Sequence, residues 1–495
     1  MLTFKSPTGP RETTHRSLWL QEALADESEE IARRERLSGT HRADICILGG
    51  GYTGLWTALF LKEQEPSLEI AIVEADVCGG GASGRNGGFA LSWWSKLATL
   101  IKHCGEDDGL WLARESEEAV KHLGTFCAEH DIDCDFRHDG WLWVASSDVQ
   151  VDTWSTTVEA CRSRDIDVFS DLTPEGSRQR GGSPRYLGGI FDSTAARVQP
   201  ARLARGLRRV ARERGVQLFE NSAVSAVEGR VPLRVRTDGG TVEADTVVCA
   251  LNAWTPGLPQ FAKLRRAIVP VASDIVATAP RPDLLEQNGW TGGELVSDSR
   301  MLVHYHRTTA DGRIAFGKGG GAMGAAGYFG ESFHYDRRRA ELTARHMRWL
   351  YPDFADVDVT HSWSGPVDRT VNGLPFFGRA DGHQNLIYGI GFSGNGVAPC
   401  VNGGRILASL ALGVDDRWTQ SALAKGPKAL FPPEPIRFLG GSVVRHAIKR
   451  KETYEDRGET APGVLSYLAQ FAPETYFKAD STPPQGQRRT SVDKR

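Results

Sequence analysis

The residues with the clearest capacity for chemistry are glycines that follow a short apolar strand. Gly49, Gly51 and Gly54 fit the pattern G-x-G-x-x-G, with Tyr52 and Thr53 between the last two. Glycines at these positions let a backbone approach a pyrophosphate, and the N-terminus of a following helix offers N–H groups to its charge. The pattern alone is a weak signal, because a chain with 55 glycines contains chance matches. Its neighbours therefore decide what it means.

The neighbours are those that a dinucleotide site requires. Residues 44–48 have the pattern of an apolar strand, residues 55–61 that of a helix, and residues 70–73 that of a second strand. Glu74 ends this second strand about 20 residues after the last glycine, where a carboxylate can accept a hydrogen bond from a ribose hydroxyl. A glycine turn that only packs a helix on a sheet would not explain this acid. The sequence therefore predicts a dinucleotide site that includes Glu74 and Ala75.

A second glycine-rich loop indicates which dinucleotide is bound. Residues 79–88 read Gly-Gly-Gly-Ala-Ser-Gly-Arg-Asn-Gly-Gly. A nicotinamide enzyme has no obvious need for this loop, whereas the ribityl chain and ring of FAD continue beyond the pyrophosphate and need a path lined by backbone. Ser83 or Asn86 could reach N5 or O4 of the ring, and Arg85 could instead pair with the pyrophosphate. The predicted cofactor-binding residues of the loop are Ala82, Ser83, Arg85, Asn86, Gly87 and Gly88.

These motifs resemble those of the FAD-dependent D-amino-acid oxidase and sarcosine oxidase superfamily, whose members carry a similar G-A-S-x-x-N-G-G loop. The sequence A-S-G-R-N-G-G at residues 82–88 resembles the loop found in the branch that contains gamma-glutamylputrescine oxidoreductases and predicted aminophosphonate oxidoreductases. The resemblance covers about residues 43–412 in three separated blocks. Three blocks in the expected order indicate the superfamily more strongly than any one of them.

The second and third blocks add further cofactor contacts. In residues 194–256 the resemblance implies that the backbone of Val224 contacts the adenine, and Asn252 stands where glycine is more usual. Residues 370–378 resemble the signature T-x-D-x-x-P-x-x-G, with Asn372 in place of Asp. A third glycine turn then precedes a predicted helix, where it suits a flavin carbonyl or a phosphate. Its predicted cofactor-binding residues are Gly391, Ser393, Gly394, Asn395 and Gly396.

The predicted fold class is α/β (α+β overall), with a Rossmann-like FAD-binding domain and a discontinuous antiparallel-sheet substrate domain. Many short strand patterns between residues 267 and 364 indicate the antiparallel sheet. The predicted segments are an N-terminal arm and short helix at 1–41; FAD-binding parts at 42–98, 194–256 and 363–415; substrate parts at 99–193 and 257–362; a C-terminal extension at 416–477; and a disordered tail at 478–495.

The candidate catalytic and substrate-binding residues come mainly from the second substrate part. His304 and His306 lie on one face of a predicted strand and Tyr305 on the other, and either face could form the substrate wall. Lys318 begins a glycine-rich loop, where its charge could stabilise developing superoxide or hold an anionic group; an exposed loop lysine is the alternative. The ring of Trp363 could bind an ammonium group. We predict His304, His306 and Lys318 as catalytic and Tyr305 and Trp363 as substrate-binding.

The resemblance implies oxidation of a C–N bond of an amine or amino acid by hydride transfer to flavin N5. The resulting imine would hydrolyse to an aldehyde or keto product. FAD is predicted to be noncovalent, because no Cys or His occurs in residues 82–88 or 365–378. The acceptor is oxygen or another carrier, and substrate identity and oligomeric state stay open. The alternatives are a flavin-dependent enzyme acting on a modified tRNA base, a nicotinamide dehydrogenase, and a flavin-bound protein without turnover.

Composition limits the partners and the compartment. The formal net charge of −3 shows no basic excess for nucleic acid, which argues against the tRNA alternative. The eight cysteines have no C-x-x-C or zinc spacing, so no metal site is predicted and a reducing compartment is expected. Residues 1–42 lack the apolar segment of a signal peptide, and no run is long enough to span a membrane, so we expect a cytoplasmic protein. The basic run at residues 445–451 is interpreted as a solvated helix face rather than as a site for an anionic partner.

Overall fold

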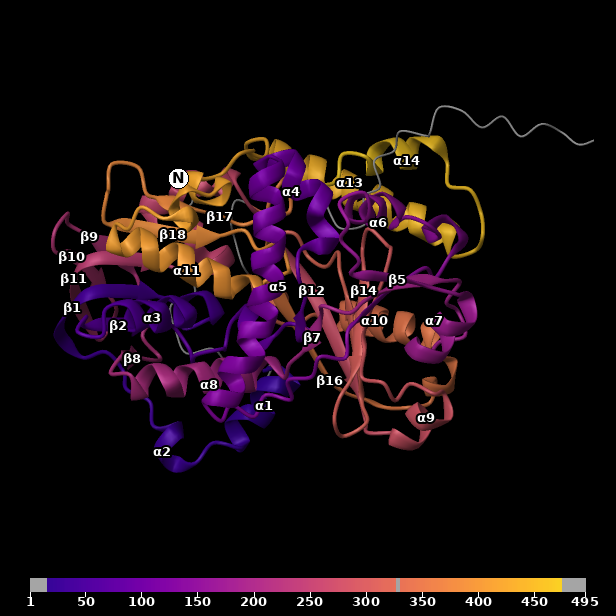
Figure 1. The fold of residues 1–495 in the computed structure, drawn as a ribbon, viewed down its shortest axis with the longest axis horizontal. Coiled ribbons are helices and arrows are strands. Elements are labelled where there is room, and N and C mark those ends of the chain that lie inside the picture. The colour runs from indigo at the N-terminus through magenta and orange to yellow at the C-terminus, as the bar shows by residue number, and fades with distance from the viewer. Residues whose placement is uncertain (1–15, 326–329, 474–495) are drawn as a thin grey trace, which may run out of the picture.

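The computed structural model describes residues 16–325 and 330–473. Residues 1–15 of the predicted N-terminal segment and all of the predicted disordered tail lie outside these residues. The strands of the described residues form two eight-stranded sheets and one two-stranded sheet. Figure 1 shows the two large sheets in the two halves of the molecule, with the long helix α5 (Glu106–Glu129) at the boundary between them.

The first sheet collects strands from three separated stretches of the chain. Its order is β17-β18-β11-β1-β2-β8, with the hairpin β9–β10 attached to β11. The four pairs along β8-β2-β1-β11-β18 are parallel, whereas β17 pairs antiparallel with β18 and β10 pairs antiparallel with β9 and β11. The bounds are β1 Gly39–Leu48, β2 Ile70–Val73, β8 Gln217–Phe219, β9 Ala226–Glu228, β10 Leu233–Arg236, β11 Gly240–Cys249, β17 Phe376–Arg379 and β18 Leu386–Ile390.

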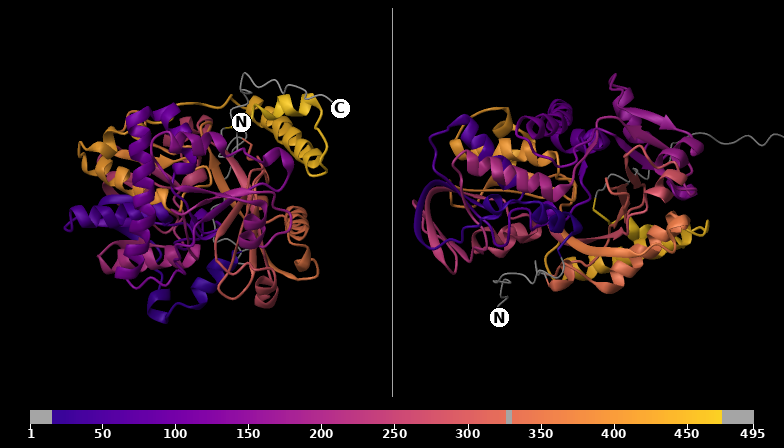
Figure 2. Two further views of the ribbon diagram at one scale, coloured as in Figure 1. Left: turned by 45° about the vertical axis from the view of Figure 1, so that its right-hand side comes forward. Right: turned by 90° about the horizontal axis from the view of Figure 1, so that it is seen from below.

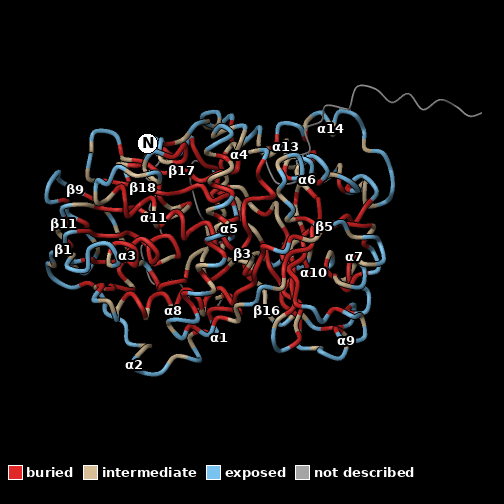
Figure 3. Tube along the Cα trace, viewed as in Figure 1, coloured by how far each residue is buried: buried red, intermediate tan, exposed pale blue. Residues whose placement is uncertain are grey.

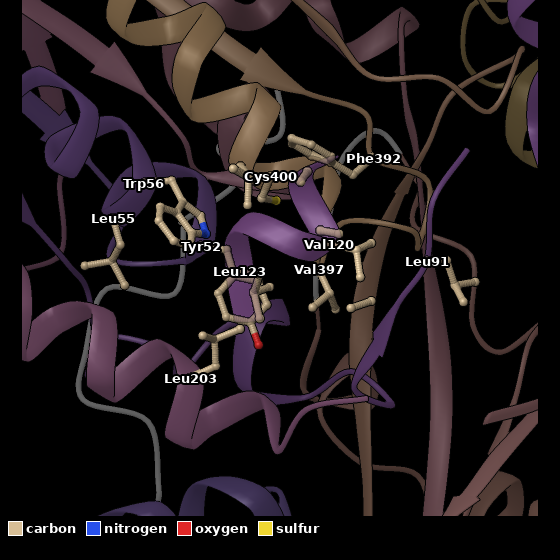
Figure 4. Close-up of a cluster of buried hydrophobic side chains, with 14 of the residues drawn as sticks. Tyr52, Leu55, Trp56, Leu91, Val120, Leu123, Leu203, Phe392, Val397 and Cys400 are labelled. Atoms are coloured by element: carbon tan, nitrogen blue, oxygen red, sulfur yellow. The ribbon is translucent and has the colours of Figure 1, made fainter. Parts of the chain in front are cut away.

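Helices cover the first sheet and bury its apolar side chains. The apolar run of β2 is buried in full, as expected for a parallel strand with both faces covered. Figure 4 shows Leu55 and Trp56 of α3, Val120 and Leu123 of α5, and Leu203 of α8 in one buried cluster. Helices α3 Tyr52–Gln64 and α11 Pro399–Leu412 contact the strands of this sheet. The further helices of this half are α1 Leu18–Ala25, α2 Glu29–Ala32, α4 Leu97–Cys104, α8 Pro200–Glu213 and α12 Arg417–Gln420.

The second sheet has the order β16-β12-β15-β14-β13-β4-β6-β5. All its neighbours are antiparallel except the parallel pair β13–β4. Its bounds are β4 Trp141–Val144, β5 Phe169–Leu172, β6 Gly189–Asp192, β12 Val269–Thr278, β13 Leu295–Asp298, β14 His304–Thr308, β15 Ile314–Lys318 and β16 Val359–Arg369. The two-stranded sheet pairs β3 (Phe89–Ala90) with β7 (Ala196–Arg197). Because β16 pairs with β12 as far as Arg369, this strand crosses the predicted segment boundary at residues 362 and 363.

One face of the second sheet packs against α10 (Arg337–Leu350). Phe316 of β15 and Met347 and Leu350 of α10 belong to one buried cluster there. Figure 3 shows buried strands in both halves of the chain trace and exposed residues at its edges. The remaining helices of this half are α6 Ser155–Arg162, α7 Pro174–Gly181 and α9 Pro282–Gln287.

The C-terminal extension forms two further helices. They are α13 (Ile436–Glu455), which contains the basic run, and α14 (Gly463–Ala469). Figure 2 shows this pair in yellow, packed on the half of the molecule that contains the second sheet. In the part of the chain that the structure describes, no helix is both long and apolar enough to cross a membrane.

Candidate active site

A cavity of about 390 Å³ lies where the two large sheets face each other. The first sheet and its loops contribute Gly49, Glu74 and Gly394, and the second sheet contributes Ser273 and Tyr305. The structure therefore brings the three predicted glycine turns to one cavity. All of the predicted cofactor-binding residues line it except Gly54, Gly88 and Gly391, which lie directly beside lining residues.

The first turn needs its glycines for close backbone packing. Gly49 has a φ of +104°, and a Cβ at Gly54 would come within 2.0 Å of the carbonyl oxygen of Gly49. A Cβ at Gly51 would come within 2.9 Å of the Ser83 hydroxyl oxygen. That oxygen accepts a hydrogen bond of 2.9 Å from the N–H of Tyr52, the first residue of α3. The first and second glycine loops are thus fastened together at the N-terminus of α3, which is suited to a pyrophosphate.

Glu74 holds a fixed carboxylate at one end of the cavity. One carboxylate oxygen accepts a hydrogen bond of 2.8 Å from Gly50 N–H, and the other accepts one of 3.0 Å from Asp76 N–H. The carbonyl oxygen of Glu74 accepts a bond of 2.8 Å from Ser222 N–H, which brings Val224 to the same end of the cavity. Val224 lies in the segment just before β9. This end therefore has the acid and the backbone expected for a ribose and an adenine.

Side chains of the second loop hold its shape. The Asn86 amide nitrogen donates to the carbonyl oxygens of Ala82 and Ser83 at 3.2 and 2.8 Å, and its oxygen accepts from Gly88 N–H at 2.8 Å. Arg85 donates to the carbonyl oxygen of Gly80 at 3.0 Å and to that of Ser364, in β16, at 3.1 Å. The polar atoms of Asn86 and the guanidinium of Arg85 thus fasten the loop that lines the cavity.

Asp368 organises the third turn from the neighbouring strand β16. Its carboxylate accepts hydrogen bonds from Gly391 N–H and, at 3.1 Å, from Ser393 N–H. Burial raises the pKa of Asp368 to about 6, against the opposing effect of these donors. Gly391, Ser393 and Gly394 all have φ between 56° and 93°. The turn places Asn395 and Gly396 at the cavity just before α11.

The opposite wall of the cavity is aromatic and apolar. The Tyr305 hydroxyl lies 2.7 Å from the Ser273 hydroxyl, and its ring meets Phe89 edge to face at 5.9 Å. Sequence reasoning found Tyr305 but missed the rest of this wall; the alternation of residues 141–144 was the signal for Trp141. The missed wall residues are Phe89, Leu91, Trp141, Ser273, Ser297, Met301, Val303, Gly319 and Gly320.

The predicted catalytic residues lie on the other face of the second sheet. His304 and His306 are fully buried, and because side chains alternate along β14, they point away from the cavity that Tyr305 lines. The Nε2 of His306 lies 2.8 Å from the Tyr186 hydroxyl, and its ring stacks on Phe316. Burial lowers the pKa of both histidines to about 3, which keeps the ring of His306 neutral; at His304 the carboxylate of Asp298, 2.8 Å from Nδ1, opposes the shift.

Lys318 and Trp363 also lie outside the cavity lining. Lys318 is the buried last residue of β15, not an exposed loop residue, and its Nζ lies 3.5 Å from Nε2 of His304. Trp363 is 1% exposed and donates through Nε1 to the carbonyl oxygen of Arg85 at 2.9 Å. The structure therefore places Trp363 against the second glycine-rich loop and outside the residues that line the cavity.

Cys400 is the one cysteine among the described residues that line the cavity. The Thr53 hydroxyl donates to its sulfur at 3.1 Å, and burial raises the pKa of the thiol to about 12. A thiol in this state is a poor nucleophile. In the described residues no group of three or more His, Cys, Asp or Glu side chains could hold a metal ion.

Comparisons with known proteins agree with this geometry. Residues 44–410 match the family described as "DAO: FAD dependent oxidoreductase". Gamma-glutamylputrescine oxidoreductase of Escherichia coli is 30% identical over 409 residues, which cover 82% of this chain and 92% of that protein. Sarcosine oxidase subunit beta of an Arthrobacter species is 26% identical over 377 residues, which cover 74% and 86%. The crystal structure of glycine oxidase from Geobacillus kaustophilus superposes with a TM-score of 0.63 at 21% identity and covers 76% of this chain and 96% of its own.

Proposed function

The chain belongs to the DAO family of FAD-dependent oxidoreductases, and on that premise we propose that it oxidises a C–N bond of a small amine in the cavity between its two large sheets. The observation that carries the proposal is the convergence of three separated glycine turns on one cavity opposite Tyr305. FAD would be held noncovalently along these turns, with its adenosine at Glu74 and Val224 and its ring toward the aromatic wall. Hydride transfer from the carbon beside the substrate nitrogen to flavin N5 would leave an imine that water hydrolyses to an aldehyde or keto product.

The chain itself supplies position and the exclusion of water. Burial raises the pKa of Tyr305, so its hydroxyl stays protonated and donates or accepts hydrogen bonds rather than acting as a base. The wall around it offers the hydroxyls of Ser273 and Ser297 among apolar side chains. An ammonium group would be costly to bury against such a wall, so the amine binds neutral, with its lone pair able to support hydride loss.

The wall also favours one kind of substrate. Among the described residues that line the cavity, the ionisable side chains are Glu74, Asp76, Arg85, Asp368 and Arg369, together with Tyr52, Tyr305 and Cys400. Glu74 and Asp76 follow β2 of the first sheet, and Arg85 donates to Gly80 and Ser364. Asp368 and Arg369 end β16 and turn to the third glycine turn, where Asp368 accepts from Ser393 N–H and Arg369 donates to the carbonyl oxygen of Ser393 at 3.4 Å. The aromatic wall has no cation for a carboxylate. We therefore favour an amine whose reacting carbon bears no carboxylate over a free amino acid, in line with the substrate named for the relative gamma-glutamylputrescine oxidoreductase.

A substrate panel tests this proposal. Purified protein is assayed with gamma-glutamylputrescine, putrescine, sarcosine, glycine, L-proline and a D-amino acid, once for hydrogen peroxide and once with an artificial electron acceptor. We expect turnover of an amine in at least one assay and kcat/KM at least about tenfold lower for the free amino acids. Turnover of free amino acids alone would overturn the substrate preference, and no turnover in either assay would overturn the proposed activity.

A further inference from the structure

The C-terminal extension lies beyond the family match, which ends at residue 410, yet it contacts the wall of the cavity. Two loops of the second sheet form that part of the wall. The loop of residues 299–303 joins β13 to β14 and contributes Met301 and Val303, and the loop of residues 319–321 follows β15 and contributes Gly319 and Gly320. The N–H of Gly319 donates to the carbonyl oxygen of Val303 at 2.9 Å, so the two loops are joined.

Helix α13 binds the first of these loops through two acidic side chains. Glu452, which is buried, accepts a hydrogen bond of 2.9 Å from Leu302 N–H. Asp456, at the C-terminal end of the helix, forms an ion pair with Arg300. Arg300 is buried and also donates to Asp298, at the end of β13, at 2.9 Å. The two anchors, at Arg300 and Leu302, flank Met301, one of the two residues of this loop that line the cavity.

The same helix binds the second loop through a basic side chain. Arg445 donates from Nη1 to the carbonyl oxygens of Gly320 and Gly321. Gly320 has a φ of +77°, and a Cβ there would lie 2.5 Å from the side chain of Leu302. The three anchors therefore act on one packed unit, because displacing either loop moves the other.

Apolar packing holds the unit against the extension. Leu302 forms a small buried cluster with Ile448 of α13 and Ala469 of α14, with Met301 packed at its edge. Burial of the acid raises the pKa of Glu452, and the nearby Lys318 and Arg300 oppose that shift. Removal of the Glu452 carboxylate would leave Lys318 and Arg300 buried with less negative charge nearby, so its replacement lowers the stability of the fold.

We propose that α13 is a positioning element of the substrate site: Arg445, Glu452 and Asp456 hold the loops of residues 299–303 and 319–321, and this fixes the depth of the cavity and selects amines by size. The proposal rests on the proposed function, because it treats Met301, Val303 and Gly320 as neighbours of the bound amine. It assigns no chemical step to α13.

The test compares Glu452→Ala with Glu452→Gln. Alanine removes the acceptor for Leu302 N–H, whereas glutamine keeps a carbonyl oxygen at that place. We expect Glu452→Ala to raise KM for the best amine about tenfold, with flavin content unchanged and kcat altered less than about threefold. We expect Glu452→Gln to stay within about threefold of the wild type in both parameters. Longer amines should lose less with Glu452→Ala than short ones, because the wall recedes.

Further variants keep the result interpretable. Arg445→Ala frees the second loop without touching the buried acid and should raise KM in the same direction, and Arg445→Lys should restore most of the loss. Thr453→Ala, on the exposed face of the same helix, should leave all parameters unchanged. Hydrogen exchange at the Leu302 amide should accelerate in Glu452→Ala alone among the position 452 variants.

The outcomes separate this proposal from the one on which it rests. If the wild type oxidises amines but Glu452→Ala and Arg445→Ala have wild-type KM values and the same preference for amine length, α13 is structural only and the inference is overturned. If the folded, FAD-loaded wild type oxidises no amine, the proposed function itself is overturned, and with it the role of α13 in selecting amines. If Glu452→Ala and Glu452→Gln changed kcat and KM to the same extent, that result would also contradict the role of the hydrogen bond to Leu302 N–H.

Discussion

The ring of Tyr305 lies against Gly317 of the neighbouring strand, and a Cβ on Gly317 would come within 2.1 Å of Cζ of that ring. The close approach is possible only because Gly317 has no side chain. The contact with Gly317 supports the Tyr305 ring on the side of the neighbouring strand. The Ser273 hydroxyl, 2.7 Å from the Tyr305 hydroxyl, holds the other end of the side chain.

Substitution at Gly317 should therefore damage the substrate site and spare the cofactor site. We expect Gly317→Ala to lower kcat/KM at least about tenfold, because the ring must move into the cavity. FAD content, measured from absorbance and protein concentration, should stay at the wild-type level. Gly440→Ala, at a helix position with open space around it, is the control. Unchanged kcat/KM in Gly317→Ala would show that Tyr305 does not border the bound amine.

Substitution at Gly54 should instead damage the cofactor site. A Cβ there would lie 2.0 Å from the carbonyl oxygen of Gly49, so the first turn must open. We expect Gly54→Ala to weaken FAD binding at least about 100-fold, measured by fluorescence titration of the apoprotein. Gly463→Ala, which meets no atom, should bind FAD as the wild type does. Tight FAD binding by Gly54→Ala would show that this turn does not set the cofactor site.

These glycines illustrate what the sequence could predict. Gly49, Gly51, Gly54 and Glu74 are neighbours in one local unit, so their spacing alone indicated a dinucleotide site. The face of β14 that meets the cavity could not be predicted. Two-residue alternation separates Tyr305 from the histidines, but only the packing of α10 on one side of the sheet decides which face is left for a ligand.

The extension shows a second limit of the sequence. The sequence predicts a solvated helix face at residues 445–451, and Arg450 is exposed. Arg445, however, donates to Gly320 and Gly321, and Glu452 just after the run binds Leu302. These partners lie more than 100 residues away in the chain, so no local pattern could indicate them.

The buried histidines predict a loss of stability in acid. The pKa of His306 in the folded state is about 3, below its usual value of 6.5, so the unfolded chain binds more protons between these pH values. Its contribution to stability is therefore complete above pH 6.5 and is lost as the pH falls towards 3. We expect His306 to contribute about 2 kcal/mol less to the free energy of unfolding at pH 5 than at pH 7.5.

Urea denaturation of the wild type and of His306→Asn at the two pH values measures this effect. The variant should be less stable at pH 7.5, because it loses the contact with the Tyr186 hydroxyl, but its stability should fall less between the two pH values. An identical fall in both proteins would show that His306 is not held neutral in the fold.

We expect FAD to dissociate from the denatured protein. Burial keeps the Cys400 thiol protonated, and residues 82–88 and 365–378 contain no Cys or His. Precipitation of the protein with acid should leave a colourless pellet and a yellow supernatant. Cys400→Ala should give the same result with the same flavin yield. Yellow colour retained in the wild-type pellet and lost in that of Cys400→Ala would identify a covalent bond to this thiol.

The most direct measurement of the central claim is an anaerobic titration of the purified, FAD-loaded protein with amines. We predict that an amine without a carboxylate on its reacting carbon bleaches the flavin band near ~450 nm, and that admission of an electron acceptor restores it. A protein that takes up no FAD, or one whose bound flavin stays oxidised with every amine and amino acid of the panel, would contradict the account.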